Sequence, residues 1–241
     1  MRLWRIIQRH GLGLPVLALV VASIVSTGLV GYRVLATRSI EPAYLVWNLF
    51  LAWLPLGFAL LAAERLRVQM AAGRTSPMRD HRLIGLGVAW LLFFPNAPYI
   101  FTDIVHVRAV WAHAFWVDLM LILFCALTGF LAGVLSLQVM HGWVTRLWGW
   151  RVGWLFVAGV SGLAGFGVYL GRFVRLNSWN VLTHPVRVLE GVGHGAWHLA
   201  TQWSHAKFVA LFSLFLLLGY GMLFAMTQRP RDQVPGLEES N

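Results

Sequence analysis

Four clusters of polar residues interrupt an otherwise apolar chain, and each stands at the end of a long apolar segment. They are Trp47-Asn48; Pro95-Asn96-Ala97-Pro98-Tyr99 with Thr102, Asp103 and His106; Trp116 with Asp118; and Tyr169, Arg172, Arg175, Asn177, Ser178 and Asn180. A charge at the centre of a bilayer costs roughly 2.5–3.5 kcal/mol on insertion scales, so polar groups in a span are paired or used in function. Because all four clusters fall at one predicted membrane depth, we expect one shared polar site.

The residue types in these clusters suit proton transfer and polar recognition. Asp103, His106 and Asp118 are the candidate catalytic residues, in the roles of acid, base or metal group. Asp103 and His106 stand three residues apart and would share a face of a helix. The candidate substrate-binding residues are Asn48, Asn96, Tyr99, Arg172, Arg175, Asn177 and Ser178.

The charges of the clusters leave two interpretations open. If Asp103 and Asp118 neutralise Arg172 and Arg175, an ion-pair network explains the clusters without any substrate. If only one carboxylate is paired, an arginine keeps a guanidinium fork suited to a phosphate or carboxylate. Spacing along the chain does not choose between them.

Metal binding is a weaker alternative. His113, and the pair His194 and His198, could add nitrogen ligands to the acidic residues. No His-Glu-x-x-His motif is present, and Gly193 and Gly195 argue against a rigid helix around the pair. We therefore predict no metal site and name no cofactor.

A phosphate loop, a Gly-x-Ser-x-Gly elbow and a nucleotide-binding glycine fingerprint are also missing, so the sequence does not decide whether the protein is an enzyme.

The elements that must position these residues are membrane spans. Of 241 residues, 59% are hydrophobic and 12% charged, against roughly 45–50% and 25% in soluble domains. We predict an all-α, polytopic bundle of about six spans in a single transmembrane domain, residues 1–229, followed by a disordered cytoplasmic tail, residues 230–241. The predicted spans are 14–32, 44–63, 83–101, 115–137, 152–171 and 206–226.

Charge sets the expected orientation. Arginines are densest in the connection after the second span, and the positive-inside rule then places both termini in the cytoplasm and the four clusters outside. A net charge of +10 is distributed beside the spans, without a nucleic-acid-binding motif, so we expect no nucleic-acid partner. Cleavage after Val34-Leu35-Ala36 is the alternative to a retained first span, but the apolar run exceeds the roughly 7–15 residues of a secretory signal.

Three local patterns predict how the spans are shaped and joined. The prolines of Pro95-Asn96-Ala97-Pro98 predict a helix break, with Asn96 or Thr102 capping the next segment; a break without further role is the alternative. The connection from about 172 to 206 is rich in apolar residues and predicts an amphipathic segment in the membrane interface. Two glycine pairs at a spacing of four residues predict close helix packing: Gly129 with Gly133, and Gly167 with Gly171.

The ordered set of motifs resembles the bacterial integral-membrane family called domain of unknown function 1361, over roughly residues 45–185. The motifs are Asn48-Leu49-Phe50-Leu51-Ala52-Trp53-Leu54-Pro55; Phe94-Pro95-Asn96-Ala97-Pro98-Tyr99 with Thr102, Asp103 and His106; Trp116 and Asp118; and Tyr169-Leu170-Gly171-Arg172-Phe173 with Arg175, Asn177, Ser178 and Trp179. In the family pattern an aromatic residue more often stands at Val117 and an Asp at Asn180. The resemblance implies a membrane protein and supplies no reaction.

Three functions remain compatible with the sequence. The first is a protein of the bacterial inner membrane whose outward-facing polar cluster binds or processes a lipid-like or lipid-linked substrate. The second is a transporter or channel subunit in which the same residues line a path, and the third is a nonenzymatic assembly or scaffold protein. The partners that we predict are the lipid bilayer and a lipid-like substrate, and the sequence does not indicate an oligomeric state.

Overall fold

The computed structural model describes residues 2–73, 80–106, 112–176 and 183–227. Within these ranges the chain is helical and contains no strand. Short turns link several helices: a 3-10 turn at Glu41–Ala43, a second at Ile100–His106 and a π-helical turn at Leu170–Val174. The α-helices are α1 (Arg2–Arg9), α2 (Gly13–Thr37), α3 (Tyr44–Ala71), α4 (His81–Phe93), α5 (Asn96–Tyr99), α6 (Ala112–Trp148), α7 (Trp150–Tyr169), α9 (Pro185–Thr201) and α10 (Trp203–Thr227).

The predicted fold class is confirmed. The described part of the chain holds 6 helical stretches long and apolar enough to cross a membrane: Gly13–Thr37, Glu41–Ala71, His81–Val105, Phe115–Trp148, Trp150–Val174 and Trp203–Thr227. These stretches run beyond the segments predicted from hydropathy, because helices continue into polar residues at their ends. The largest difference is in α6, which ends at Trp148 rather than near 137; only Gly149, at φ 89°, separates it from α7. The predicted tail, 230–241, lies outside the described residues.

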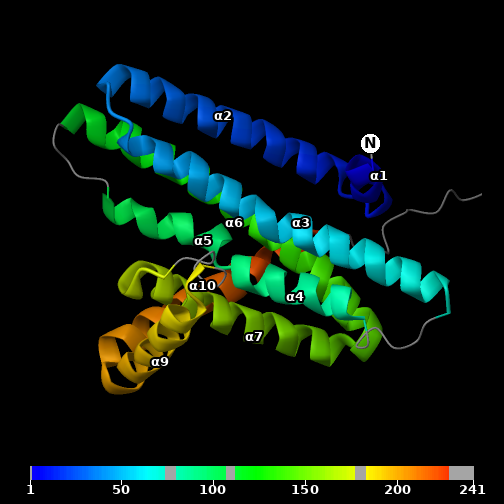
Figure 1. The fold of residues 1–241 in the computed structure, drawn as a ribbon. Helices are drawn as coiled ribbons and strands as arrows, with labels where there is room; N and C mark the ends of the chain where they lie inside the picture. Colours follow the sequence, from blue (N-terminus) through cyan, green and yellow to red (C-terminus); the bar gives the residue numbers. More distant parts are fainter. Residues whose placement is uncertain (1, 74–79, 107–111, 177–182, 228–241) are drawn as a thin grey trace, which may run out of the picture.

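Helix α6 lies at the centre of the bundle (Figure 1) and packs against α2, α3, α5 and α7. Helix α3 lies alongside it, α10 packs mainly on α7, and α9 lies at one end of the bundle. The end of α2 and the beginnings of α3 and α6 meet at this same end. The helix ends that carry the polar clusters are therefore brought together.

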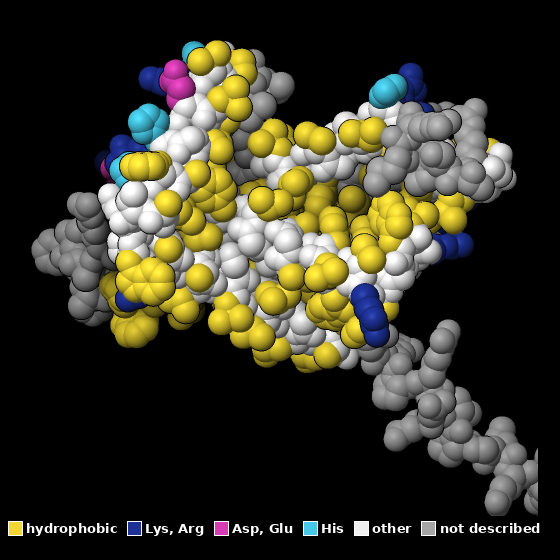
Figure 2. Space-filling view, turned by 90° about the horizontal axis from the view of Figure 1, so that it is seen from below, with side chains coloured by type: hydrophobic (Ala, Val, Ile, Leu, Met, Phe, Trp, Pro, Cys, Tyr) yellow, Lys and Arg dark blue, Asp and Glu magenta, His cyan; other side chains and the backbone are white. Residues whose placement is uncertain are grey.

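The surface has the distribution expected of a membrane-embedded bundle. Figure 2 shows charged and histidine side chains at the two ends of one face, with hydrophobic surface between them. Helix α9 exposes apolar side chains, Val186, Leu189 and Trp197, beside the exposed charged residues Arg187 and Glu190. This composition is typical of a helix that lies in the membrane interface.

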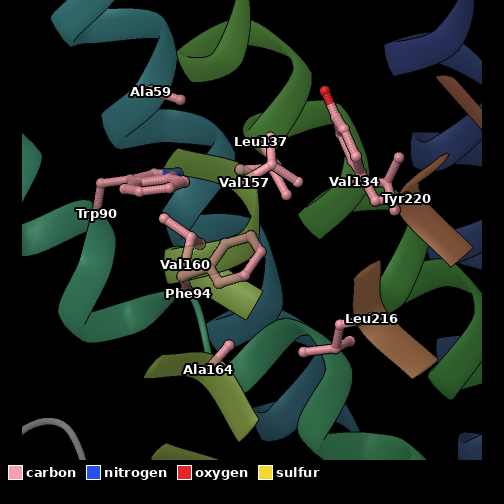
Figure 3. Close-up of a cluster of buried hydrophobic side chains, with 10 residues drawn as sticks. All are labelled: Ala59, Trp90, Phe94, Val134, Leu137, Val157, Val160, Ala164, Leu216 and Tyr220. Atoms are coloured by element: carbon pink, nitrogen blue, oxygen red, sulfur yellow. The ribbon is translucent and has the colours of Figure 1, made fainter. Parts of the chain in front are cut away.

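One of the buried hydrophobic clusters of the core combines side chains from α3, α4, α6, α7 and α10 (Figure 3). Trp90 on α4 is 1% exposed and stacks on Phe156, and its indole Nε1 donates to Ser136 Oγ at 3.3 Å. Because lipid tails are as apolar as leucine, such packing and hydrogen bonds hold membrane helices together rather than exclusion from water. The core thereby fixes α4 and α7, which flank the site, against α6.

At the opposite end of the bundle, Asp80 caps α4. Its Oδ1 accepts the amide of Arg82 at 3.0 Å, and its Oδ2 accepts from Arg65 Nε at 2.5 Å and from the Gln69 side chain. The Arg65 guanidinium holds the pKa of the Asp80 carboxyl below its usual range. The Arg65 side chain, which the sequence indicated only as a determinant of topology, therefore also holds the end of α3 to the start of α4.

Candidate functional site

The site is built around the helix break that follows α4. The helix ends at Phe93, and the chain continues through the short α5 into the 3-10 turn. Ala97 donates its amide to Phe94 O, so Phe93 O accepts instead from Asn96 Nδ2 at 3.0 Å. Thr102 Oγ1 likewise donates to a carbonyl, that of Tyr99, at 2.7 Å. The predicted break is confirmed, and these two side chains donate to backbone carbonyls at the break.

Both predicted glycine pairs pack against this break. On α6, a Cβ at Gly129 would lie 3.0 Å from the carbonyl oxygen of Ala97, and one at Gly133 would lie 2.7 Å from Ala97 Cβ. On α7, a Cβ at Gly167 would lie 2.5 Å from Pro95 Cγ. The prediction of close packing is confirmed, and the packed partner is the break itself.

Asp103 is the buried centre of the site. The residue is 2% exposed, its Oδ2 accepts from Asn48 Nδ2 at 3.0 Å, and its Oδ1 lies 3.6 Å from Arg172 Nη1. Asn48 belongs to α3 and Arg172 to the π-helical turn after α7. One carboxylate therefore ties together the three chain segments that the sequence predicted would converge.

Asp118 has a different partner from the one expected. The sequence offered Arg172 and Arg175 as its neutralising residues, but Asp118 Oδ1 and Oδ2 accept from Arg33 Nε at 2.5 Å and Nη2 at 2.8 Å. This two-point pair joins α2 to α6. Arg33 was missed because its position near the end of a span is also where arginines that only set topology occur.

Not every candidate reaches this centre. Arg175 is exposed and adopts φ 60° at the end of the π-helical turn, and the ion pairs of Asp118 and Asp103 are with Arg33 and Arg172 instead. The 3-10 turn includes His106, but its side chain lies outside what the structure describes, as do Asn177 and Ser178. Their roles stay predictions.

Two adjoining cavities meet at Asn48 and Tyr99, which line both. The first, the polar cavity, has a volume of about 750 Å³ and is lined by Arg33, Thr37, Ser39, Glu41, Pro42, Tyr44, Leu45, Asn48, Tyr99, Asp103, Asp118, Leu121 and Ile122. The second, the apolar cavity, measures about 400 Å³ and is lined by Asn48, Leu51, Val88, Leu91, Leu92, Pro95, Asn96, Tyr99, Leu163, Phe166, Gly167, Leu170, Gly171, Leu176, Val188 and Val192. The site is thus charged on one side and almost wholly apolar on the other.

The histidines of α9 belong elsewhere. His194 and His198 line a separate cavity of about 390 Å³ together with His205 of α10 and Tyr169 of α7. Across the described ranges, no three His, Cys, Asp or Glu side chains are grouped so that they could hold a metal ion. The two cavities that meet at Asn48 and Tyr99 can therefore accept protons and bind polar groups at Asp103 and Asp118. They also offer apolar contact next to these carboxylates.

These features define a multi-pass helical membrane protein with a charged and an apolar cavity side by side at one end of the bundle. The chain belongs to the family described as "Protein of unknown function (DUF1361)", whose model matches residues 47–218. The matched segment includes Asn48, Asp103, Asp118 and Arg172, whereas Arg33 precedes it. Neither a curated protein nor a solved structure matches the sequence.

Proposed function

We propose that the protein binds a lipid-like amphiphile, with the headgroup in the polar cavity and the hydrocarbon chain in the apolar cavity. The observation that carries the proposal is that Asn48 and Tyr99 line both cavities, so the polar and the apolar cavity adjoin. A ligand that contacts both must combine a polar end with an apolar end. Ligand sites generally have this mixed character, with a few polar groups fixing orientation beside apolar lining.

The apolar cavity lies where a hydrocarbon chain could enter from the bilayer. Its walls come from α4, α7 and α9, with Leu92, Phe166 and Val192 as examples. Helix α9 has the composition of an interfacial helix, so this wall lies at the boundary between headgroups and acyl chains. The polar cavity beside it supplies Asp118, whose side chain is 31% exposed and so accessible to a headgroup.

We further infer a bacterial inner membrane location with both termini in the cytoplasm, which places the joined cavities on the noncytoplasmic side. The support is the group of five arginines that runs from the end of α3 to the start of α4: Arg65, Arg67, Arg74, Arg79 and Arg82. In a Cys125→Ser background, Ser39→Cys should react with a membrane-impermeant maleimide in intact cells, whereas Ala72→Cys should react only after the cells are opened. The reverse pattern would refute the orientation.

Photo-crosslinking tests the binding proposal. The full chain in maltoside micelles is irradiated with a monoacylglycerol that carries a diazirine near the end of its chain, and the adducts are mapped by mass spectrometry. We expect adducts on the parts of α4 and α7 that line the apolar cavity, and competition by unlabelled monoacylglycerol. An uncharged probe makes this outcome independent of headgroup charge.

Helix α9 offers a matched pair of variants for the same assay. Val192 lines the apolar cavity, whereas Leu189 is 73% exposed on the same helix and lines neither cavity. Val192→Trp should fill part of the cavity and reduce the adducts, and Leu189→Trp should leave them unchanged. Adducts spread over the lipid-facing surfaces of α2 and α10, insensitive to Val192→Trp, would show nonspecific partitioning and end the proposal.

A further inference from the structure

The arginines of the site are already engaged by carboxylates. Arg33 holds both oxygens of Asp118, and Arg172 lies 3.6 Å from Asp103. An anionic headgroup would therefore have to compete with a resident carboxylate for each guanidinium. The expectation that a site arginine awaits a phosphate or carboxylate is not supported by this geometry.

Glu41 adds a negative charge to the polar cavity. It begins the 3-10 turn between α2 and α3, is exposed, and lines the polar cavity. Within the described ranges its carboxylate has no ion-pair partner. Among the described residues, the lining contains three carboxylates, Glu41, Asp103 and Asp118, and one guanidinium, that of Arg33, while Arg172 pairs with Asp103.

Aromatic side chains complete the wall. Tyr44, which is 39% exposed, and Tyr99 both line the polar cavity. The face of an aromatic ring attracts a cation through its quadrupole, and quaternary ammonium groups are commonly recognised by such rings. Excess negative charge and aromatic walls favour the same kind of ligand.

We propose that the headgroup bound in the polar cavity is cationic, an amine or a quaternary ammonium, and that Glu41 contributes to its selection. This inference rests on the proposed binding of an amphiphile at the joined cavities. It replaces the anion-binding role predicted for the arginines with a structural one, in which they hold Asp103 and Asp118 in place.

The test is competition against the uncharged photo-crosslinking probe by two amphiphiles with the same chain, dodecyltrimethylammonium and dodecyl phosphate. We expect the cationic compound to displace the probe at lower concentration. Because Glu41 is exposed, Glu41→Gln should weaken that displacement by roughly two- to fivefold, the range for an exposed charge pair. Glu190→Gln, an exposed carboxylate that lines neither cavity, should leave it unchanged.

The outcomes separate the two proposals. A charged amphiphile also alters the potential of the micelle surface. The effect of Glu41→Gln is therefore given as a ratio: the concentration of competitor that displaces the probe from the variant, divided by the concentration that displaces it from the unchanged protein. Suppose that the probe labels the apolar cavity. If dodecyl phosphate then competes as well as the cationic compound or better, or if Glu41→Gln has no effect on displacement, the proposal of a cationic headgroup is wrong, while the proposal of amphiphile binding stands. Absence of specific labelling would instead remove the binding proposal itself.

Discussion

Asp103→Ala should lower the free energy of unfolding of the bundle by about 3–5 kcal/mol, the usual effect of removing one partner from a buried ion pair. Asp103 is 2% exposed and connects α3, through Asn48, to the turn after α7, through Arg172. Alanine would remove the carboxylate opposite Arg172, whose side chain is only 19% exposed. The measurement is thermal or denaturant unfolding of the purified full chain in maltoside micelles.

Two further variants distinguish the loss of a buried structural contact at Asp103 from a general effect of losing a negative charge. Asp103→Asn keeps an oxygen that can accept from Asn48 but removes the charge opposite Arg172. We therefore expect its free energy of unfolding to lie between those of the unchanged protein and Asp103→Ala. Asp118→Asn breaks a pair that is partly exposed, and its loss should be near 1 kcal/mol or less. Equal losses at Asp103 and Asp118 would contradict a buried structural centre at Asp103.

Gly167→Ala should destabilise the bundle by about 1–3 kcal/mol, as overpacking of a close contact does. A Cβ at this position would lie 2.5 Å from Pro95 Cγ and 2.9 Å from Pro95 Cβ. The proline ring is rigid, so α7 or the helix break must move. Since both residues line the apolar cavity, labelling by the photo-crosslinking probe should fall as well.

Gly162→Ala on the same helix is the matched control for this variant. A Cβ at Gly162 meets nothing within 4 Å, so the change should be neutral or stabilise by up to about 1 kcal/mol through helix propensity. Unfolding and probe labelling are measured side by side for the two variants. If Gly167→Ala were as stable as Gly162→Ala, α7 would not be packed against the break as described.

The overall fold and the convergence at Asp103 could be predicted from sequence because both follow from the cost of polar groups in lipid. Long apolar segments define the spans, and polar residues at their ends must meet or face water. Asn48, Asp103 and Arg172 could therefore be grouped before their contacts were known. The helix break was also predictable, because proline has no amide donor.

The pairing within the cluster could not be predicted in the same way. Which arginine reaches Asp118 depends on how α2 is rotated against α6, and hydropathy contains no information about rotation. Arg33 therefore looked like a determinant of topology, and Arg175 like a partner. Similarly, the spacing of Gly167 and Gly171 predicts a close approach but not that the approaching element is the break at Pro95.

The central claim is that one amphiphile occupies both cavities. The most direct measurement is an electron cryomicroscopy structure of the full chain in nanodiscs that contain phosphatidylethanolamine and phosphatidylglycerol. We expect elongated density between α4, α7 and α9 that continues past Asn48 and Tyr99 into the polar cavity beside Glu41 and Asp118. A well-resolved map in which side chains close the passage between the two cavities, with no continuous density across it, would contradict the claim.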